Sequence, residues 1–95
     1  MSQEEVKNCI NVINEALEQI NLAKLFPDKR SRENKIRDAK HVAHDMVIPY
    51  KAELIVICNL EHIGEELFDW GHLESDLQTV FEKLKEILKE DKNYN

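Results

Sequence analysis

A long helical pattern of apolar residues around a proline limits what this chain can fold into. Between Asn34 and Phe68, apolar side chains recur at steps of three or four residues. That period belongs to an α-helix with one buried face, whereas a half-buried strand would alternate at every second position. The predicted buried positions are Ile36, Ala39, Ala43, Met46, Tyr50, Leu54, Ile57, Leu60, Ile63 and Leu67.

Pro49 lies in the middle of this pattern. A proline inside a helix removes one backbone hydrogen bond and costs about 3 kcal/mol, so it bends or breaks the helix. Either one long helix bends near residues 45–49, or one helix ends near Val47 and a second begins near Pro49. The apolar pattern keeps its phase across the proline, which favours the bent helix.

The rest of the chain supplies a helix on each side. Ser2 and Glu5 have the spacing of a capping box, which predicts a first helix from there to about Leu25. The residues Phe26-Pro27-Asp28 end it, because the residue before a proline avoids helical geometry. Ser31, followed by Asn34, is predicted to cap the second helix.

The last helix is predicted from about His72 to Glu90, after a break at Trp70-Gly71 in which Gly71 serves as a left-handed C-cap. With only two glycines and two prolines in 95 residues, the chain lacks the many turns of a β protein. We therefore predict an all-α fold, a small up-down bundle of three or four helices with helix 2 bent or broken near Pro49. Residues 1–95 are predicted to form a single domain.

The net charge and the cysteines indicate which partners and which cellular location the protein has. The net charge is −6, so the surface as a whole is predicted to repel duplex nucleic acid and anionic membranes. Charged residues occur throughout the first twenty positions, and no uncharged run is long enough to span a bilayer, so we predict neither a signal peptide nor membrane insertion. Cys9 and Cys58 each lie among apolar neighbours, which favours buried reduced thiols and a cytoplasmic location.

Positive charge is concentrated in one segment. Residues 24–40 contain seven basic and three acidic side chains, a net charge near +4, which leaves about −10 for the rest of the chain. All three arginines, Arg30, Arg32 and Arg37, lie within it. Because arginine binds phosphate with two parallel hydrogen bonds, one hypothesis is a small phosphorylated ligand at the start of helix 2. The alternative is a solvated surface whose bases pair with neighbouring acids.

Histidines and carboxylates occur at helical spacing, for example Asp38 with His41 and His62 with Glu66. Such pairs can bind a metal ion from one helix turn. His44 lies off the apolar face, however, and Gly71 interrupts the Asp69–His72 pair. We therefore predict no metal and no cofactor.

The segment His44-Asp45-Met46-Val47-Ile48-Pro49-Tyr50 places an acid directly after a histidine and a proline five residues beyond it. Residues 34–90 thereby resemble the phosphoacceptor helical hairpin of sensor histidine kinases. The resemblance implies a dimeric four-helix bundle in which His44 accepts a phosphoryl group and Asp45 orients its imidazole. Histidine phosphotransfer through His44 is accordingly our second functional hypothesis.

Our first hypothesis is a small acidic regulatory protein, such as an inhibitor, an immunity protein or an accessory subunit, that acts by binding another protein and is not an enzyme. An acidic surface steers association with a basic partner surface. The residues predicted to form it are Glu61, Glu65, Glu66 and Asp69, with Glu74 and Asp76 alongside. Trp70 lies at a turn and is predicted to anchor the partner, because tryptophan is frequent among binding hot spots. A homodimer is a further possibility under this hypothesis.

Overall fold

The computed structural model describes the backbone of residues 3–94 and the side chains of residues 3–90. Within these residues the fold is all-α, as predicted, with helices α1 (Gln3–Ala23), α2 (Lys29–Val47), α3 (Lys51–Ile57) and α4 (Leu73–Tyr94). Three short 3-10 segments, η1 (Ile48–Tyr50), η2 (Glu61–Glu66) and η3 (Trp70–His72), connect the later helices. The predicted capping residue Ser2 lies outside the described residues.

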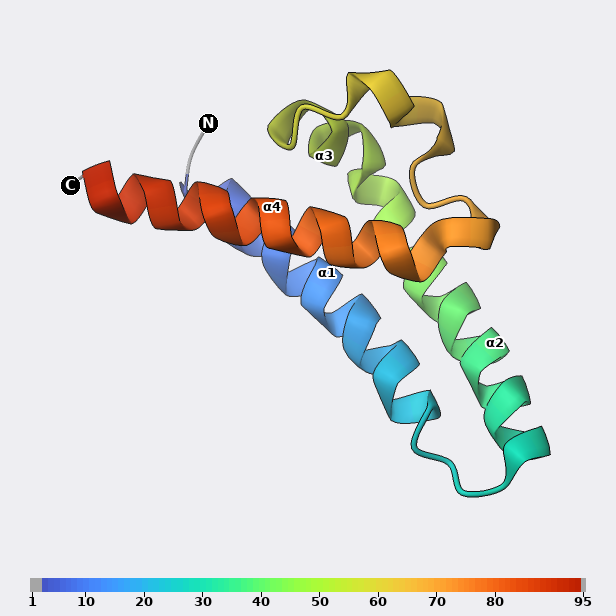
Figure 1. The fold of residues 1–95 in the computed structure, drawn as a ribbon. Helices are drawn as coiled ribbons and strands as arrows, with labels where there is room; N and C mark the ends of the chain where they lie inside the picture. Colours follow the sequence, from blue (N-terminus) through green and yellow to red (C-terminus); the bar gives the residue numbers. More distant parts are fainter. Residues whose placement is uncertain (1–2, 95) are drawn as a thin grey trace.

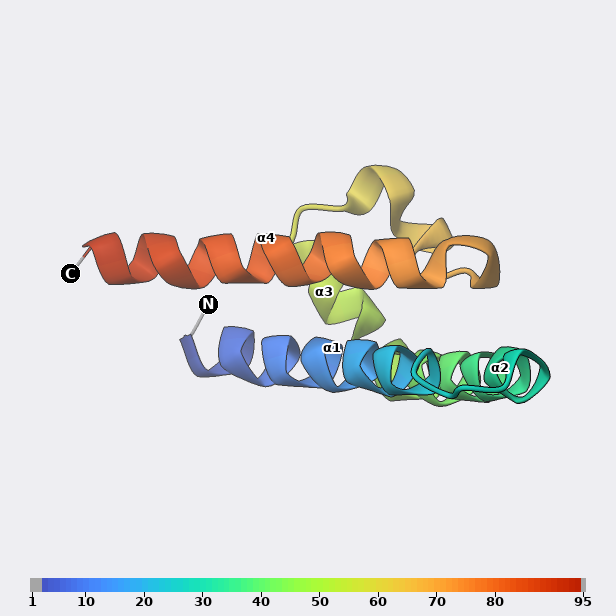
Figure 2. The same cartoon turned by 60° about the horizontal axis from the view of Figure 1, so that its bottom comes forward.

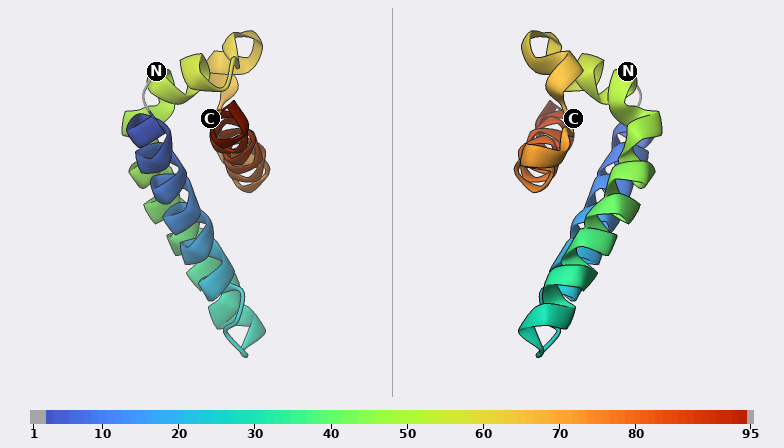
Figure 3. Two further views of the ribbon diagram at one scale, coloured as in Figure 1. Left: turned by 90° about the vertical axis from the view of Figure 1, so that its left-hand side faces the viewer. Right: turned by 90° about the vertical axis from the view of Figure 1, so that its right-hand side faces the viewer.

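The helices form two layers. Helices α1 and α2 make an antiparallel hairpin, and α4 crosses it in a second layer (Figures 1 and 2). Helix α1 contacts both α2 and α4 along much of its length, while α2 and α4 hardly touch. The loop end of the hairpin projects well beyond α4, as Figure 3 shows. The molecule is therefore elongated, with principal extents of 48, 27 and 17 Å.

The core lies between the two layers and follows the predicted apolar positions. Helix α1 buries residues at helical spacing from Val6 to Ala23, and α4 buries Leu73, Leu77, Val80 and Leu84. Helix α2 contributes the small side chains Ala39 and Ala43, which let it approach α1 closely. The remaining predicted positions of the central stretch are buried or half-buried, so the apolar pattern identified the inward face correctly.

The central stretch is nevertheless not one helix. Helix α2 ends at Val47, Pro49 lies in the 3-10 turn η1, and α3 then leaves in a new direction (Figure 3). Helix α3 ends after seven residues, because Asn59 has a φ of 57°. The N–H groups of Asn59 and Leu60 donate to the carbonyls of Val56 and Ile55, which is the hydrogen-bond pattern of a Schellman cap.

Three predicted boundaries are wrong. Gly71 has no positive φ and lies within η3, so it is not a left-handed C-cap. Helix α4 continues to Tyr94 and does not end at Glu90. Helix α2 begins before Ser31, because the side chain of Asp28 is its N-cap and accepts a hydrogen bond of 2.8 Å from the Ser31 N–H.

The Asp28 cap predicts a pH-dependent contribution to stability. The hydrogen bonds from Ser31 lower the pKa of Asp28 from 3.8, with the charge of Arg32 adding to the effect. A lowered folded-state pKa means that the cap stabilises the fold above the unfolded pKa and is lost as the pH falls through the folded one. We expect Asp28→Ala to lower the Tm at neutral pH, and the gap from wild type to narrow below about pH 4.

Circular dichroism melts across this pH range measure that gap, with Asp28→Asn as the control. Asparagine is also a good N-cap but does not titrate, so it is expected to retain most of the neutral-pH Tm. A gap between wild type and Asp28→Ala that stays constant down to pH 3 would show that the charge of Asp28 does not stabilise the helix.

Candidate groove between α3 and η2

A solvent-open groove lies between α3 and the 3-10 segment η2. Its floor is formed by the apolar side chains of Ile48, Ala52 and Ile55 and by Gly64, and its volume is about 540 Å³. Lys51, Glu61 and Glu65 form the rim. Ile48 is 39% exposed although it is large and apolar. An apolar centre with a polar rim is also the general layout of protein–protein interfaces.

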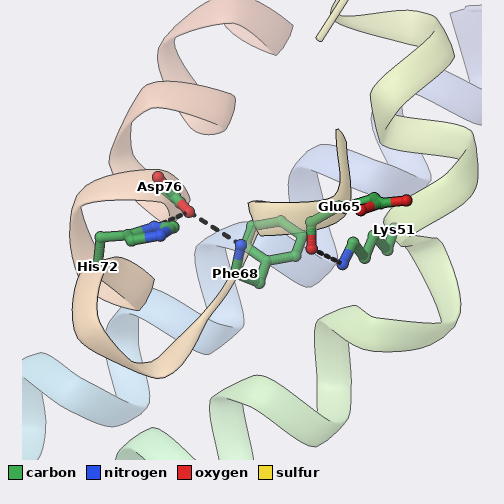
Figure 4. A network of polar contacts seen from close by, with 5 residues as sticks. All are labelled: Lys51, Glu65, Phe68, His72 and Asp76. Atoms are coloured by element: carbon green, nitrogen blue, oxygen red, sulfur yellow. Dashed lines mark hydrogen bonds and ion pairs between the residues drawn. The ribbon is translucent and has the colours of Figure 1, made fainter. Parts of the chain in front are cut away.

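Close contacts hold η2 against α3 and so shape this groove. A Cβ atom on Gly64 would lie only 3.3 Å from Cδ1 of Ile55, so the glycine allows the two segments to approach. The ammonium of Lys51 donates to the backbone carbonyl of Glu65 at 3.0 Å (Figure 4). The Lys51 ammonium keeps its positive charge in this bond, so the rim, with Glu61 and Glu65, carries a net charge of about −1.

The chain after η2 is fixed to the first turn of α4. The Phe68 N–H donates to Oδ2 of Asp76 at 2.9 Å, and the same oxygen lies 2.5 Å from Nδ1 of His72 (Figure 4). The Phe68 side chain is fully buried, and its φ of 69° lies in the left-handed region that side chains with a Cβ seldom adopt. These contacts anchor the far end of the segment that forms one wall of the groove.

The acidic residues predicted as one binding surface divide into two groups. Glu61, Glu65, Glu66 and Asp69 are exposed, and the first two form the groove rim. Glu74 forms an ion pair with Lys24, and Asp76 is half-buried in its contacts with Phe68 and His72. The last two therefore join segments of this chain.

Trp70 lies outside the groove. Its indole stacks on the imidazole of His41 with ring centroids 4.4 Å apart, which joins η3 to α2. The side chain remains 44% exposed beside a polar hollow of about 410 Å³ that Lys40 also lines. The role of Trp70 as a partner anchor stays a prediction.

The three arginines are not gathered at the start of α2. Positions 30 and 37 lie two turns apart on one side of the helix, while position 32 is turned by about 200° from position 30. Arg32 donates to the Phe26 carbonyl at 3.2 Å and Arg37 to the Asn34 side chain at 3.2 Å. The N–H of Ser31, which a phosphate at this terminus would need, already donates to Asp28. The phosphorylated-ligand hypothesis stays a prediction.

The His44 hypothesis also stays a prediction. The imidazole is 35% exposed, and its Nδ1 lies 3.6 Å from Oδ1 of Asp45. Helix α2, which carries His44, ends at Val47, and Pro49 lies in the 3-10 turn η1.

The thiols are unsuited to nucleophilic chemistry. Burial, with the charge of Glu53 adding to it, raises the pKa of Cys9 to about 11, and burial also raises the pKa of Cys58. Both side chains are therefore protonated at neutral pH. His, Cys, Asp and Glu side chains among residues 3–90 nowhere gather in a group of three that could hold a metal ion.

The groove was not foreseen from the sequence, although Glu61 and Glu65 were named. Its floor residues Ile48, Ala52 and Ile55 come from the stretch that was predicted to be a helix bent or broken near Pro49. The signal that could have revealed it is the Cys58-Asn59 step, since asparagine is a frequent left-handed cap.

None of the helices within residues 3–94 has an apolar run long enough to cross a lipid bilayer. Comparisons of this chain with protein-family models, with curated proteins and with solved structures found no match.

Proposed function

We propose that this protein is a cytoplasmic regulatory module that binds another protein through the groove between α3 and η2. The partner segment is an amphipathic helix whose apolar side chains occupy the floor and whose lysines or arginines face Glu61 and Glu65. An inhibitor, an immunity protein or an accessory subunit works by binding of this kind.

The observation that carries the proposal is the exposed apolar floor beside two carboxylates. Ile48, which is 39% exposed, and the half-buried Ile55 line an open groove between α3 and η2. Covering such a floor releases about 25 cal/mol for each Å² of apolar surface removed from water. The carboxylates add selection for a basic partner, because an acidic segment would meet like charge.

The test uses a fluorescently labelled peptide of leucines and lysines that forms a basic amphipathic helix. We expect Glu61→Lys with Glu65→Lys to weaken its binding by at least about tenfold in an anisotropy titration, which corresponds to 1.4 kcal/mol. The matched control is Glu82→Lys with Glu86→Lys, which changes the same charge at the same spacing on the exposed side of α4. That control is expected to stay within about threefold of wild type, because neither Glu82 nor Glu86 lines the groove.

A second variant separates the floor from the charge. Ala52→Trp places a large ring in the groove without altering the charged rim. It is therefore expected to lower the affinity for the peptide, because the ring blocks the apolar floor. Equal losses in the two glutamate pairs would mean that net charge, not the groove, attracts the peptide. Unchanged affinity in Ala52→Trp would mean that the floor is not used.

A further inference from the structure

The loop end of the α1–α2 hairpin carries large apolar side chains in water. Leu22, Leu25 and Phe26 are 60%, 76% and 42% exposed, and they lie within five residues of one another at the loop end of the hairpin, which projects beyond α4 (Figure 3). Lys29 and Arg30 follow directly in the first turn of α2 and are also exposed. We call these five residues the hairpin tip.

The charges around the tip are divided between internal contacts and solvent. Asp28, the acid nearest to the apex, is held by the Ser31 N–H. Lys24 pairs with Glu74, Arg32 holds the Phe26 carbonyl, and the Lys35 ammonium lies 5.4 Å from the Phe26 ring centroid. Lys29 and Arg30 remain to give the exposed apolar side chains a basic border.

The hairpin tip therefore has the chemistry that the groove is proposed to select. The groove offers an apolar floor with an acidic rim, and the tip offers apolar side chains with a basic border. We propose that the groove of one molecule binds the hairpin tip of a second copy of this chain. This inference rests on the proposed function, because it uses the same groove and names one of its partners.

The geometry requires that the contact be between molecules. In Figure 1 the tip lies at the bottom and α3 and η2 lie at the top, with the continuous helices α1 and α2 running up from the tip. A tip cannot bend back to its own groove without breaking both helices. Two molecules side by side and antiparallel each place a tip at the groove of the other, which gives a closed two-fold pair.

Charge separation along the molecule supports this pairing. Residues 22–40, which contain the tip, have a net charge near +4, and residues 48–69, which contain the groove, have five acidic side chains and one basic one, a net charge near −4. At physiological salt the Debye length is about 8 Å, so each end acts through its own charge and not through the net charge of the molecule. An antiparallel pair brings the basic end of each copy to the acidic end of the other.

The expected pair is weak and salt-sensitive. A groove lined by seven residues supports a contact smaller than a standard interface of about 1,600 Å², as in transient complexes. The second contact of a closed pair forms within the complex and so adds to the first. A basic partner segment competes for the same groove, so partner binding would separate the two copies.

Sedimentation equilibrium at low ionic strength tests the inference with two charge reversals. Lys29→Glu with Arg30→Glu reverses the tip, and Glu61→Lys with Glu65→Lys reverses the groove rim. We expect wild type to form dimers, and each reversal to raise the dimer Kd by at least about tenfold. The variant that carries all four substitutions has the wild-type net charge and complementary surfaces again, so it is expected to regain the dimer. Glu82→Lys with Glu86→Lys is the matched control and is expected to keep it.

Folding is checked for each variant by circular dichroism, and acids in the first turn of α2 are favourable to that helix. Three results would overturn the inference: a wild-type monomer at every concentration, a dimer that survives reversal of the tip, or masses that keep growing beyond two copies. A wild-type monomer that still binds the basic peptide would leave the proposed function intact. A wild-type protein that forms the dimer but does not bind the basic peptide would instead contradict the proposed function.

Discussion

Replacing Phe68 by alanine is expected to lower the free energy of unfolding by about 3–5 kcal/mol, the usual cost of truncating a buried phenylalanine. The side chain is fully buried and is the largest in the core. For a domain of this size each kcal/mol corresponds to about 4–8 °C, so the Tm is expected to fall by at least about 12 °C. Urea denaturation followed by circular dichroism measures the change. Phe26→Ala, the same truncation at an exposed site, is expected to cost less than about 1 kcal/mol.

Glycine at position 68 separates packing from backbone strain. Glycine usually destabilises relative to alanine by about 0.5–1 kcal/mol, because it loses more backbone freedom on folding. A left-handed residue with a Cβ costs about 1–2 kcal/mol, and Phe68 has a φ of 69°. We therefore expect Phe68→Gly to be at least as stable as Phe68→Ala. A clearly more stable alanine variant would show that the left-handed geometry at this position carries no cost.

The inward face of every helix could be predicted from the sequence, because burial follows the helical period. Val6, Ile13 and Ile20 in α1, and Leu77 and Leu84 in α4, are buried as their spacing indicates. The pattern could not show where α3 ends. The 3-10 segment η2 has three residues per turn, so apolar residues there keep steps of three or four, as in an α-helix.

The turn geometries were not accessible from residue type alone. Gly71 was assigned the left-handed conformation because glycine adopts it at no cost, yet Asn59 and Phe68 are the non-glycine residues that adopt it within residues 3–94. At position 59 the residue type itself favours the left-handed conformation, because asparagine adopts it more readily than most residues with a Cβ. At Phe68 tertiary contacts decide the backbone, since burial of the ring and the bond to Asp76 offset the strain.

The candidate site was predicted only in part, because its shape depends on these turn geometries. The carboxylates of Glu61 and Glu65 could be named from charge, but their apolar floor depends on a change of chain direction at Pro49 and Asn59. An anion site was one hypothesis for the basic segment, because arginines cluster along the sequence, and it stays a prediction. Helical rotation turns Arg32 away from Arg30, and Arg32 donates to the Phe26 carbonyl. Lys29 and Arg30 stay exposed as part of the hairpin tip.

The second large effect is expected at Asp76, whose carboxylate holds the Phe68 backbone. Asp76→Ala removes the acceptor of the Phe68 N–H, and an unsatisfied buried donor costs about 1–3 kcal/mol. The same substitution removes the partner of His72, an exposed pair that contributes at most about 1 kcal/mol. We therefore expect His72→Ala to lower the free energy of unfolding much less than Asp76→Ala does.

Asparagine at position 76 keeps an oxygen acceptor and is expected to retain most of the stability that alanine loses. Hydrogen exchange at the Phe68 amide provides the local measurement, with fast exchange expected in Asp76→Ala and protection in Asp76→Asn. Equal losses in Asp76→Ala and His72→Ala would assign the stabilisation to the ion pair and not to the backbone bond. This bond anchors the segment that carries Glu61 and Glu65. Asp76→Ala is therefore also expected to lower the affinity for the basic peptide, whereas His72→Ala is expected to leave that affinity unchanged. A carboxylate that lies outside the groove lining thus holds the wall of the groove in place.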